Sequence, residues 1–298
     1  MKRIMLVALI LAGVAGCSPR TAKPGNWQPV RSETISHQFM YAGFASETEG
    51  MVLGQTGSGH TGRIYTTTDA GASWNEGQNT SRFLYGLDIV DANVAWVCGD
   101  ASFVRKSVDG GKTWQAVGNF GSTEPNQCRF LSFLDAQTGW AATPTELGQT
   151  TDGGQIWTDI SLPTGGQTIA ALDLRTPAEG AVLDSSGRLF MTHDDGKSWS
   201  ELKLDFTGGA MLGKMPSPSV AMRLIDEARI MIALYRNPSG SGFTIWSAYT
   251  EDGGKSWQMA QVPAGDGLLN LYLSRDGRIL TTSNTGLLAV ATFRYQQP

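Results

Sequence analysis

The sequence predicts an all-β protein, a six-bladed β-propeller with four-stranded blades in which the N-terminal strand closes the last blade. The first observation behind this prediction is an eight-residue box, Ser/Thr-x-Asp-x-Gly-x-x-Trp, which begins at Thr67, Ser107, Thr150, Thr192 and Thr250. Successive boxes begin 40, 43, 42 and 58 residues apart, and a repeat of about 40 residues is typical of propellers. The second observation is that short apolar or β-branched runs, separated by Asp, Asn, Gly and Ser turns, fill each repeat, which is an all-β pattern.

The chain begins with a segment typical of a lipoprotein signal peptide, residues 1–16. Lys2 and Arg3 precede an apolar run over residues 4–14, which is too short for an ordinary membrane-spanning helix. The sequence Val14-Ala15-Gly16-Cys17 resembles the lipobox of bacterial lipoproteins, which implies cleavage before Cys17 and lipidation of its thiol. The alternative is a plain secretory signal with an incidental cysteine.

Residues 17–25 are predicted to be the lipidated cysteine and a polar tether, and residues 26–298 a single propeller domain. Ser18 resembles the enterobacterial sorting signal that favours the outer membrane, which implies anchoring on its periplasmic side in a Gram-negative host. Cleavage would leave 21 basic residues against 27 acidic ones, a net charge of −6. The sequence has no basic run, which argues against a nucleic-acid partner.

The N-terminal strand is predicted from one tryptophan. Trp27 begins a run, Trp-Gln-Pro-Val, that nearly repeats the Trp-Gln-Ala-Val beginning at Trp114, the last residue of the second box. At the other end, residues 268–295 supply three strands and no box, so we expect the strand after Trp27 to complete the last blade. The long fourth interval is accounted for by Gly/Pro/Ser-rich loops at residues 205–219 and 237–242, which we expect on one face.

Each box is predicted to be a structural turn between the third and fourth strands of its blade. The Asp carboxylate can accept backbone N–H bonds, the Gly permits a conformation that a Cβ opposes, and the Trp buries a large ring. Five ligand or metal sites are the weaker alternative. The Asp and Trp residues of the boxes are Asp69, Trp74, Asp109, Trp114, Asp152, Trp157, Asp194, Trp199, Asp252 and Trp257.

Two cysteines remain in the predicted mature body. Cys98 and Cys128 fall in consecutive repeats of an exported chain, so they could form a disulfide between neighbouring blades. The alternative is two small buried thiols.

The sequence contains no recognisable catalytic set, metal-ligand spacing or cofactor motif. The three histidines, His37, His60 and His193, lie in different repeats and away from any Cys pair. A Gly-x-Gly-x-x-Gly at residues 57–62 is followed by a strand rather than a helix, so it reads as a hairpin loop and not as a dinucleotide site.

One aligned column of the inner strands is a candidate binding site: Gly43, Asp88, Ser132, Asp173, Arg223 and Leu271. Asp88, Asp173 and Arg223 could form a ring facing the central channel. That ring is either a structural ion-pair network or a small-ligand site at the channel mouth. Arg82 and Arg129 precede their inner strands, and we expect them on the same rim.

Leu134–Ala142 together with Thr150–Trp157, and less closely Val90–Val97, resemble the repeat of the photosystem II stability/assembly factor family. The resemblance implies a non-enzymatic, exported and often lipidated propeller that binds other proteins during assembly of membrane complexes. Asp boxes also occur in sialidases, a more distant resemblance, but their Arg-Ile-Pro motif is missing here. We therefore predict a lipid-anchored protein-binding or assembly module of the bacterial cell envelope. A glycoside hydrolase or glycan-binding propeller is the alternative.

Overall fold

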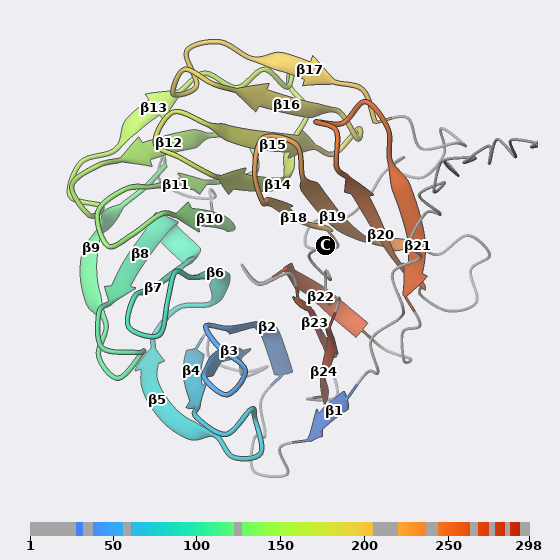
Figure 1. The fold of residues 1–298 in the computed structure, drawn as a ribbon. Helices are drawn as coiled ribbons and strands as arrows, with labels where there is room; N and C mark the ends of the chain where they lie inside the picture. The colour runs from blue at the N-terminus through green and yellow to red at the C-terminus, as the bar shows by residue number, and fades with distance from the viewer. Residues whose placement is uncertain are drawn as a thin grey trace, which may run out of the picture.

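The computed structural model describes residues 28–31, 38–55, 61–121, 127–204, 220–236, 244–262, 268–273, 278–283 and 287–292. Figure 1 shows strands arranged radially around a central space, with one strand of each sheet innermost. The signal peptide, Cys17, Trp27 and the two long loops lie outside the described residues. Within the described part of the chain, no helix is long and apolar enough to cross a membrane.

Five blades have four antiparallel strands that follow one another in sequence. The first contains β2 (Gln38–Phe44), β3 (Gly50–Gln55), β4 (Gly62–Thr67) and β5 (Asn75–Thr80). The second contains β6 (Leu84–Ile89), β7 (Ala95–Gly99), β8 (Phe103–Ser107) and β9 (Gln115–Asn119), with a short 3-10 turn, η1 (Asp100–Ser102), before β8. The third contains β10 (Phe130–Phe133), β11 (Gly139–Ala142), β12 (Leu147–Thr150) and β13 (Thr158–Ile160).

The fourth and fifth blades repeat this plan. The fourth contains β14 (Ile169–Leu174), β15 (Gly180–Asp184), β16 (Leu189–Thr192) and β17 (Ser200–Leu202). The fifth contains β18 (Val220–Leu224), β19 (Ile230–Arg236), β20 (Thr244–Thr250) and β21 (Gln258–Val262). In all five blades an Asp box joins the third strand to the fourth, which is where the sequence predicts it.

The prediction of six blades closed by the N-terminal strand needs correction. The structure has five complete blades of the repeated, boxed kind, and the remaining sheet is not a copy of them. It contains β22 (Leu268–Leu273), β23 (Arg278–Ser283) and β24 (Leu287–Thr292), with β1 (Gln28–Arg31) beside β24. The residues after β24, where a box would stand, read Phe-Arg-Tyr-Gln-Gln-Pro and contain no box. Because the closing strand was predicted from Trp27, which is not among the described residues, we carry that prediction no further.

The core lies between neighbouring blades, where alternate side chains of each sheet face the next sheet. Trp96 of β7 and Trp140 of β11 are fully buried. Trp96 stacks on Phe133 of the next blade with ring centroids 3.7 Å apart. Trp140 covers the backbone of Gly180 in the fourth blade, where a Cβ would lie 2.2 Å from the indole. Because large rings on one blade meet glycines or rings on the next, each blade is stabilised mainly by its neighbours.

Candidate functional site

Each Asp box is a closed hydrogen-bonded turn. In the first box, Asp69 Oδ1 accepts from Thr67 Oγ1 at 2.8 Å and from the Ser73 backbone N–H at 2.8 Å. Its Oδ2 accepts from Ser73 Oγ at 2.6 Å, and the Gly71 N–H donates to Thr67 Oγ1 at 2.8 Å. The box glycines have φ between +76° and +86°, a region that side chains with a Cβ disfavour.

These hydrogen bonds explain the acidity of the box carboxylates. The Ser73 hydroxyl, then the Ser73 N–H and the Thr67 hydroxyl, lower the pKa of Asp69 from 3.8 to about 2. The same kind of bond, led by a Ser or Thr hydroxyl, lowers the pKa to about 2 in three other boxes, at Asp109, Asp194 and Asp252. The box carboxylates therefore serve their own turns, and no group of three His, Cys, Asp or Glu that could hold a metal occurs among the described residues.

The third box lacks one of these bonds. Ile156 stands where the other boxes have Ser or Thr, and its side chain is 70% exposed. Asp152 Oδ1 still accepts from the backbone N–H groups of Ile156 and Gln155, both at 3.0 Å. The Ile156 N–H is the main cause of the lowered pKa of Asp152, and no hydroxyl from position 156 adds to it. This box thus lacks the Ser or Thr hydroxyl bond of its four relatives, and Asp152 accepts instead from a second backbone N–H, that of Gln155.

At the centre of the molecule, the predicted column forms a ring of contacts from blade to blade. Asp88 Oδ2 accepts from the Phe133 N–H at 2.6 Å. Ser132 Oγ in turn accepts from the Leu174 N–H at 2.9 Å and donates to Asp173 Oδ1 at 3.0 Å. Each side chain thus bonds the neighbouring inner strand one residue beyond that strand's own column position.

Arg223 completes this ring. Asp173 Oδ2 accepts from the Leu224 N–H at 2.7 Å, while Arg223 donates to Asp173 Oδ1 at 2.6 Å and to Asp88 Oδ1 at 3.1 Å. Its Nε donates to the Leu273 carbonyl of β22 at 2.9 Å. Figure 1 shows two inner strands, β10 and β14, between β6 and β18 in ring order. The bond from Arg223 to Asp88 therefore joins inner strands that are not neighbours.

The charges of this ring are satisfied internally. Asp88 is fully buried, Asp173 is 2% exposed and Ser132 is fully buried. Burial alone would lower the pKa of Arg223, but the negative charges of Asp173 and Asp88 raise it further above its usual range. A carboxylate and guanidinium so engaged have little capacity left for a ligand, so we assign Asp88, Asp173 and Arg223 to the structural network that the sequence left as one of two interpretations.

The column ends at Tyr272 rather than at the expected Leu271. In β2, β6, β10, β14 and β18 the column residue is opposite the second residue of the next strand, as Asp88 is opposite Trp96. β22 does not keep this pairing, because Ile279 is opposite Leu273. Tyr272 is instead the second-last residue of β22, which is the place that Asp88 has in β6. A Cβ on Gly43 would lie 2.9 Å from the Tyr272 ring, so this ring occupies the space left by the glycine.

A cluster of polar and aromatic side chains lies at one end of the inner strands, and of its members the sequence analysis named only Arg129. Arg129 donates to Gln127 Oε1 at 2.8 Å, and its guanidinium lies 5.6 Å from the centroid of the Tyr85 ring. Gln127 Nε2 donates to Asp100 Oδ1 at 3.1 Å and to the Tyr85 hydroxyl at 3.3 Å. We call Tyr41, Tyr85, Asp100, Gln127 and Arg129 the rim cluster.

Tyr41 joins this cluster electrostatically. Burial raises the pKa of Tyr41, Arg129 opposes that rise, and Tyr85 adds to it. Arg129, Gln127 and Tyr85 are each partly exposed, so the cluster reaches the surface. Arg82, two residues before β6, is exposed. The structure therefore places both predicted rim arginines at the same end of neighbouring inner strands.

A disulfide underlies the rim cluster. Cys98 of β7 and Cys128 are bonded, with Cα atoms 5.6 Å apart, and both are fully buried. Cys128 lies between Gln127 and Arg129, and its N–H donates to the Gly99 carbonyl at 3.2 Å. The bond therefore ties the segment that bears the rim side chains to the second blade.

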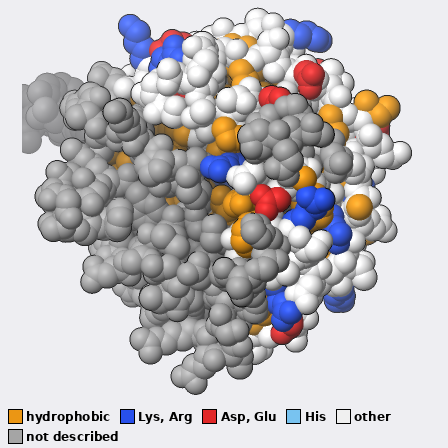
Figure 2. Space-filling model, turned by 180° about the vertical axis from the view of Figure 1, so that it is seen from behind, with side chains coloured by type: hydrophobic (Ala, Val, Ile, Leu, Met, Phe, Trp, Pro, Cys, Tyr) orange, Lys and Arg blue, Asp and Glu red, His pale blue; other side chains and the backbone are white. Residues whose placement is uncertain are grey.

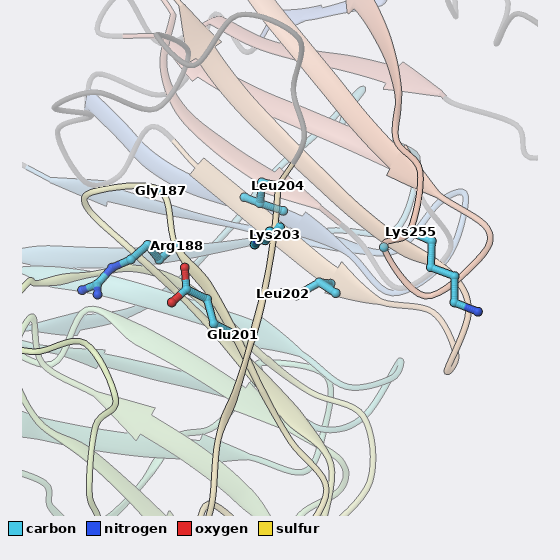
Figure 3. Close-up of a pocket in the computed structure, with 8 residues that line it drawn as sticks. Gly187, Arg188, Glu201, Leu202, Lys203, Leu204 and Lys255 are labelled. Atoms are coloured by element: carbon cyan, nitrogen blue, oxygen red, sulfur yellow. The ribbon is translucent and has the colours of Figure 1, made fainter.

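The surface is mixed in charge. On the described part of the face seen in Figure 2, cationic, anionic and hydrophobic side chains are interspersed. A pocket of about 710 Å³ lies between the fourth and fifth blades, lined by Gly187, Arg188, Glu201, Leu202, Lys203, Leu204, Gly254 and Lys255. Figure 3 shows that its Arg188 and Lys255 point apart, and Arg188 is already paired with Asp184 at 2.8 Å. The polar groups of this pocket do not converge on one point.

The radial four-stranded sheets define a β-propeller. The matched curated relative is the photosystem II assembly lipoprotein Ycf48 of Synechococcus sp. (strain CC9902), 26% identical over 194 residues, which is 62% of this chain and 55% of the relative. The match thus spans about half the length of that relative. The chain belongs to the family described as photosynthesis system II assembly factor YCF48, whose model matches residues 76–241.

Solved structures agree with the fold. YCF48 bound to a D1 peptide is 13% identical with a TM-score of 0.56, and the alignment covers 91% of this chain and 97% of that one. YCF48 from Cyanidioschyzon merolae is 16% identical with a TM-score of 0.55, covering 89% and 98%. A streptogramin B lyase is 9% identical with a TM-score of 0.59, covering 91% and 98%. At these identities the likeness concerns the fold alone.

Proposed function

We propose that this chain is a non-enzymatic assembly factor that binds a segment of a membrane-complex protein through the rim cluster. Family membership supports the assembly role, and one relative of the same fold is known bound to a D1 peptide. The observation that carries the choice of surface is the contrast between centre and rim. The central carboxylates are buried and Arg223 is bonded to both of them, whereas the rim presents partly exposed Tyr and Arg side chains.

Tyr and Arg are the side chains most enriched at the centres of protein interfaces. In the rim cluster they are held in place before any partner arrives, because Gln127 links Tyr85 to Asp100 and the disulfide fixes Cys128. Such preorganisation reduces the entropy lost on binding. The partner that fits best is a polypeptide segment with a carboxylate or carbonyl oxygen for Arg129 and apolar surface for the tyrosine rings.

We also propose that the protein is held at the cell envelope by a lipid on Cys17, with residues 1–16 removed and residues 17–25 serving as the tether to the propeller. The matched relative is a lipoprotein, and residues 14–17 carry the lipobox pattern. Replacing Cys17 with Ser should move the protein from the membrane fraction to the soluble fraction of the host. Unchanged membrane association of that variant would count against the anchor.

The binding role is tested by cross-linking and affinity capture from detergent-solubilised envelope. The wild-type protein should recover a specific membrane-complex protein, and the double variant Arg82→Ala/Arg129→Ala should lose most of it. Arg229→Ala is the matched control, because Arg229 is a partly exposed arginine of the fifth blade whose partner is Asp226. A panel of fluorogenic glycosides tests the carbohydrate alternative, and turnover that disappears in Asp88→Ala would refute the non-enzymatic role.

A further inference from the structure

A second pocket, of about 500 Å³, lies between the second and third blades. It is lined by Phe120, Gly121, Thr145, Glu146, Leu147, Trp157, Asp159, Ile160 and Leu162. Its lining comes from the end of the second blade, from the turn between β11 and β12, and from β13 with the residue before it. The pocket is thus formed by two blades together, and its lining contains none of the residues of the central ring.

The floor of this pocket is aromatic and rigid. Phe120 is 2% exposed, and its ring lies on the backbone of Gly148, where a Cβ would come within 2.2 Å of it. The Trp157 ring lies 5.2 Å from the Phe120 ring at an interplanar angle of 55°, and it also meets Phe133 edge-on at 6.3 Å. Because these rings are fixed by the blades behind them, the pocket exists without a ligand.

The charged side chains of the described lining are both carboxylates. Asp159 is exposed and stands directly opposite Gly148 in the β12–β13 pairing. Residues opposite each other in a sheet project from the same face, so the Asp159 side chain stands on the face that the Phe120 ring covers. Glu146 belongs to a turn fixed by its own N–H, which donates to Thr143 Oγ1 at 3.0 Å. A pocket whose described lining contains two aromatic rings, two carboxylates and no cationic side chain is complementary to a cation.

The corresponding position in the fourth blade has a different character. Glu201 of β17 lines the pocket of Figure 3, but Arg188, Lys203 and Lys255 line it as well. The pocket of the fourth blade is therefore mixed in charge, whereas the charged side chains described in the pocket of the third blade are both acidic.

We propose that this pocket binds a lysine or arginine side chain of the protein partner. A cation over the face of a Trp or Phe ring is attracted by the ring quadrupole, and a carboxylate at the rim of the pocket pairs with its charge. The proposal deepens the proposed function and rests on it, because the Arg129 N–H donates to the Ala142 carbonyl at 2.9 Å, immediately before the turn that carries Glu146. One extended segment can therefore contact the rim cluster with an acidic or carbonyl group and this pocket with a basic side chain.

The direct test uses the full mature protein with ¹⁵N-labelled tryptophan and capped tripeptides Gly-Arg-Gly and Gly-Lys-Gly as probes. The indole resonance of Trp157, assigned by its loss in Trp157→Phe, should shift saturably with both peptides and not with Gly-Glu-Gly or Gly-Leu-Gly. Asp159→Asn and Glu146→Gln should each weaken binding by about threefold, the effect typical of one surface charge pair. Glu201→Gln, the matched change in the fourth blade, should leave binding unchanged.

A Trp157 resonance that ignores the cationic peptides, or that responds equally to the acidic and apolar ones, would overturn the proposal. So would full binding in the combined Glu146→Gln/Asp159→Asn variant. Arg129→Ala separates this test from that of the proposed function. It should reduce capture of the envelope partner while leaving the peptide-induced shift of Trp157 intact, so that either idea can fail without the other.

Discussion

At the scale of single residues, the boxes show how one side chain decides the strength of a turn. Four boxes hold their Asp with a hydroxyl at the last position before the Trp, and the third box has Ile156 there instead. An exposed isoleucine gains little from its position, and the Asp beside it loses a donor. The third blade, which carries Arg129 and the pocket lined by Glu146 and Asp159, therefore has a box without a hydroxyl bond to its Asp.

We predict that Ile156→Thr raises the melting temperature, because the new hydroxyl would donate to Asp152 as Thr113 does to Asp109 at 2.6 Å. A rise of about 2 °C is the size expected for one partly exposed hydrogen bond in a chain of this length. The reverse change, Thr113→Ile in the second box, should lower it by a similar amount. Calorimetry of both variants checks the pair, and a stabilising Thr113→Ile would contradict the account of the box.

The box carboxylates also predict an acid limit. Their pKa values are depressed in the folded state, from 3.8 to about 2 in four boxes. A group with a depressed folded pKa stabilises the fold above its unfolded pKa, and that stabilisation is lost as pH falls through the folded value. Unfolding free energy should therefore decline between about pH 4 and pH 2. Urea titrations followed by tryptophan fluorescence measure this free energy at each pH. The decline should be less steep in Asp109→Asn. A wild-type free energy that stays constant between pH 4 and pH 2 would contradict this account of the boxes.

At the scale of elements, the disulfide connects two blades at the point where the rim cluster is built. It closes a loop of 30 residues, for which chain-entropy arguments give a stabilisation of about 2–4 kcal/mol. We predict that Cys98→Ser/Cys128→Ser lowers the unfolding free energy by that amount and weakens partner capture, because Gln127 and Arg129 lose their anchor. Mass spectrometry of the unreduced native protein checks the bond itself, and two free thiols would refute it.

Sequence reasoning succeeded where the contacts are local. Each box makes its bonds within eight residues, so its residues and its place between the third and fourth strands could be predicted from spacing alone. The rim cluster could not be predicted in this way. Tyr85 lies at a register shift between Leu84 and Gly86, which changes the direction of its side chain. Its bond with Gln127 joins residues that are distant in the sequence. An aligned column three residues before Asp88 and Ser132 would have paired Tyr85 with Arg129.

The prediction of the last residue in the inner-strand column was wrong for a related reason. No box follows β24, the third strand of the same sheet, so the sequence does not fix the position of β22 relative to the other inner strands. Leu271 was therefore expected where the structure has Tyr272. The blade count rested in the same way on the unboxed ends of the chain. The pocket lined by Glu146 and Asp159 could not be predicted from the sequence. Its Phe120 ring comes from the second blade and its carboxylates come from the third, and only the fold brings them together.

At the scale of the whole molecule, Arg223 links strands that are distant in the ring. Removing it would leave Asp88 and Asp173 buried without a cation, which typically costs about 3–5 kcal/mol. We predict that Arg223→Met lowers the unfolding free energy by this amount in chemical denaturation. Arg229→Met, which breaks the partly exposed pair with Asp226, should cost less than about 1 kcal/mol. Equal effects of the two changes would contradict a central role for Arg223.

In the molecule as a whole, the central side chains bond to one another, whereas the side chains of the rim cluster reach the surface. Its blades are held by boxes, rings and the Arg223 network, and the groups left at the surface of the second and third blades are those suited to a polypeptide partner. Binding should therefore depend on the rim cluster and not on the central ring. This separation is the central claim of the proposed function.

The most direct test is the affinity of the purified mature protein for the partner identified by cross-linking, measured by calorimetry with wild type and Arg129→Ala. We predict at least a tenfold loss of affinity for Arg129→Ala, about 1.4 kcal/mol or more, with an unchanged melting temperature. Unchanged affinity in that variant, with the fold intact, would contradict the claim that the rim around Arg129 is the binding surface.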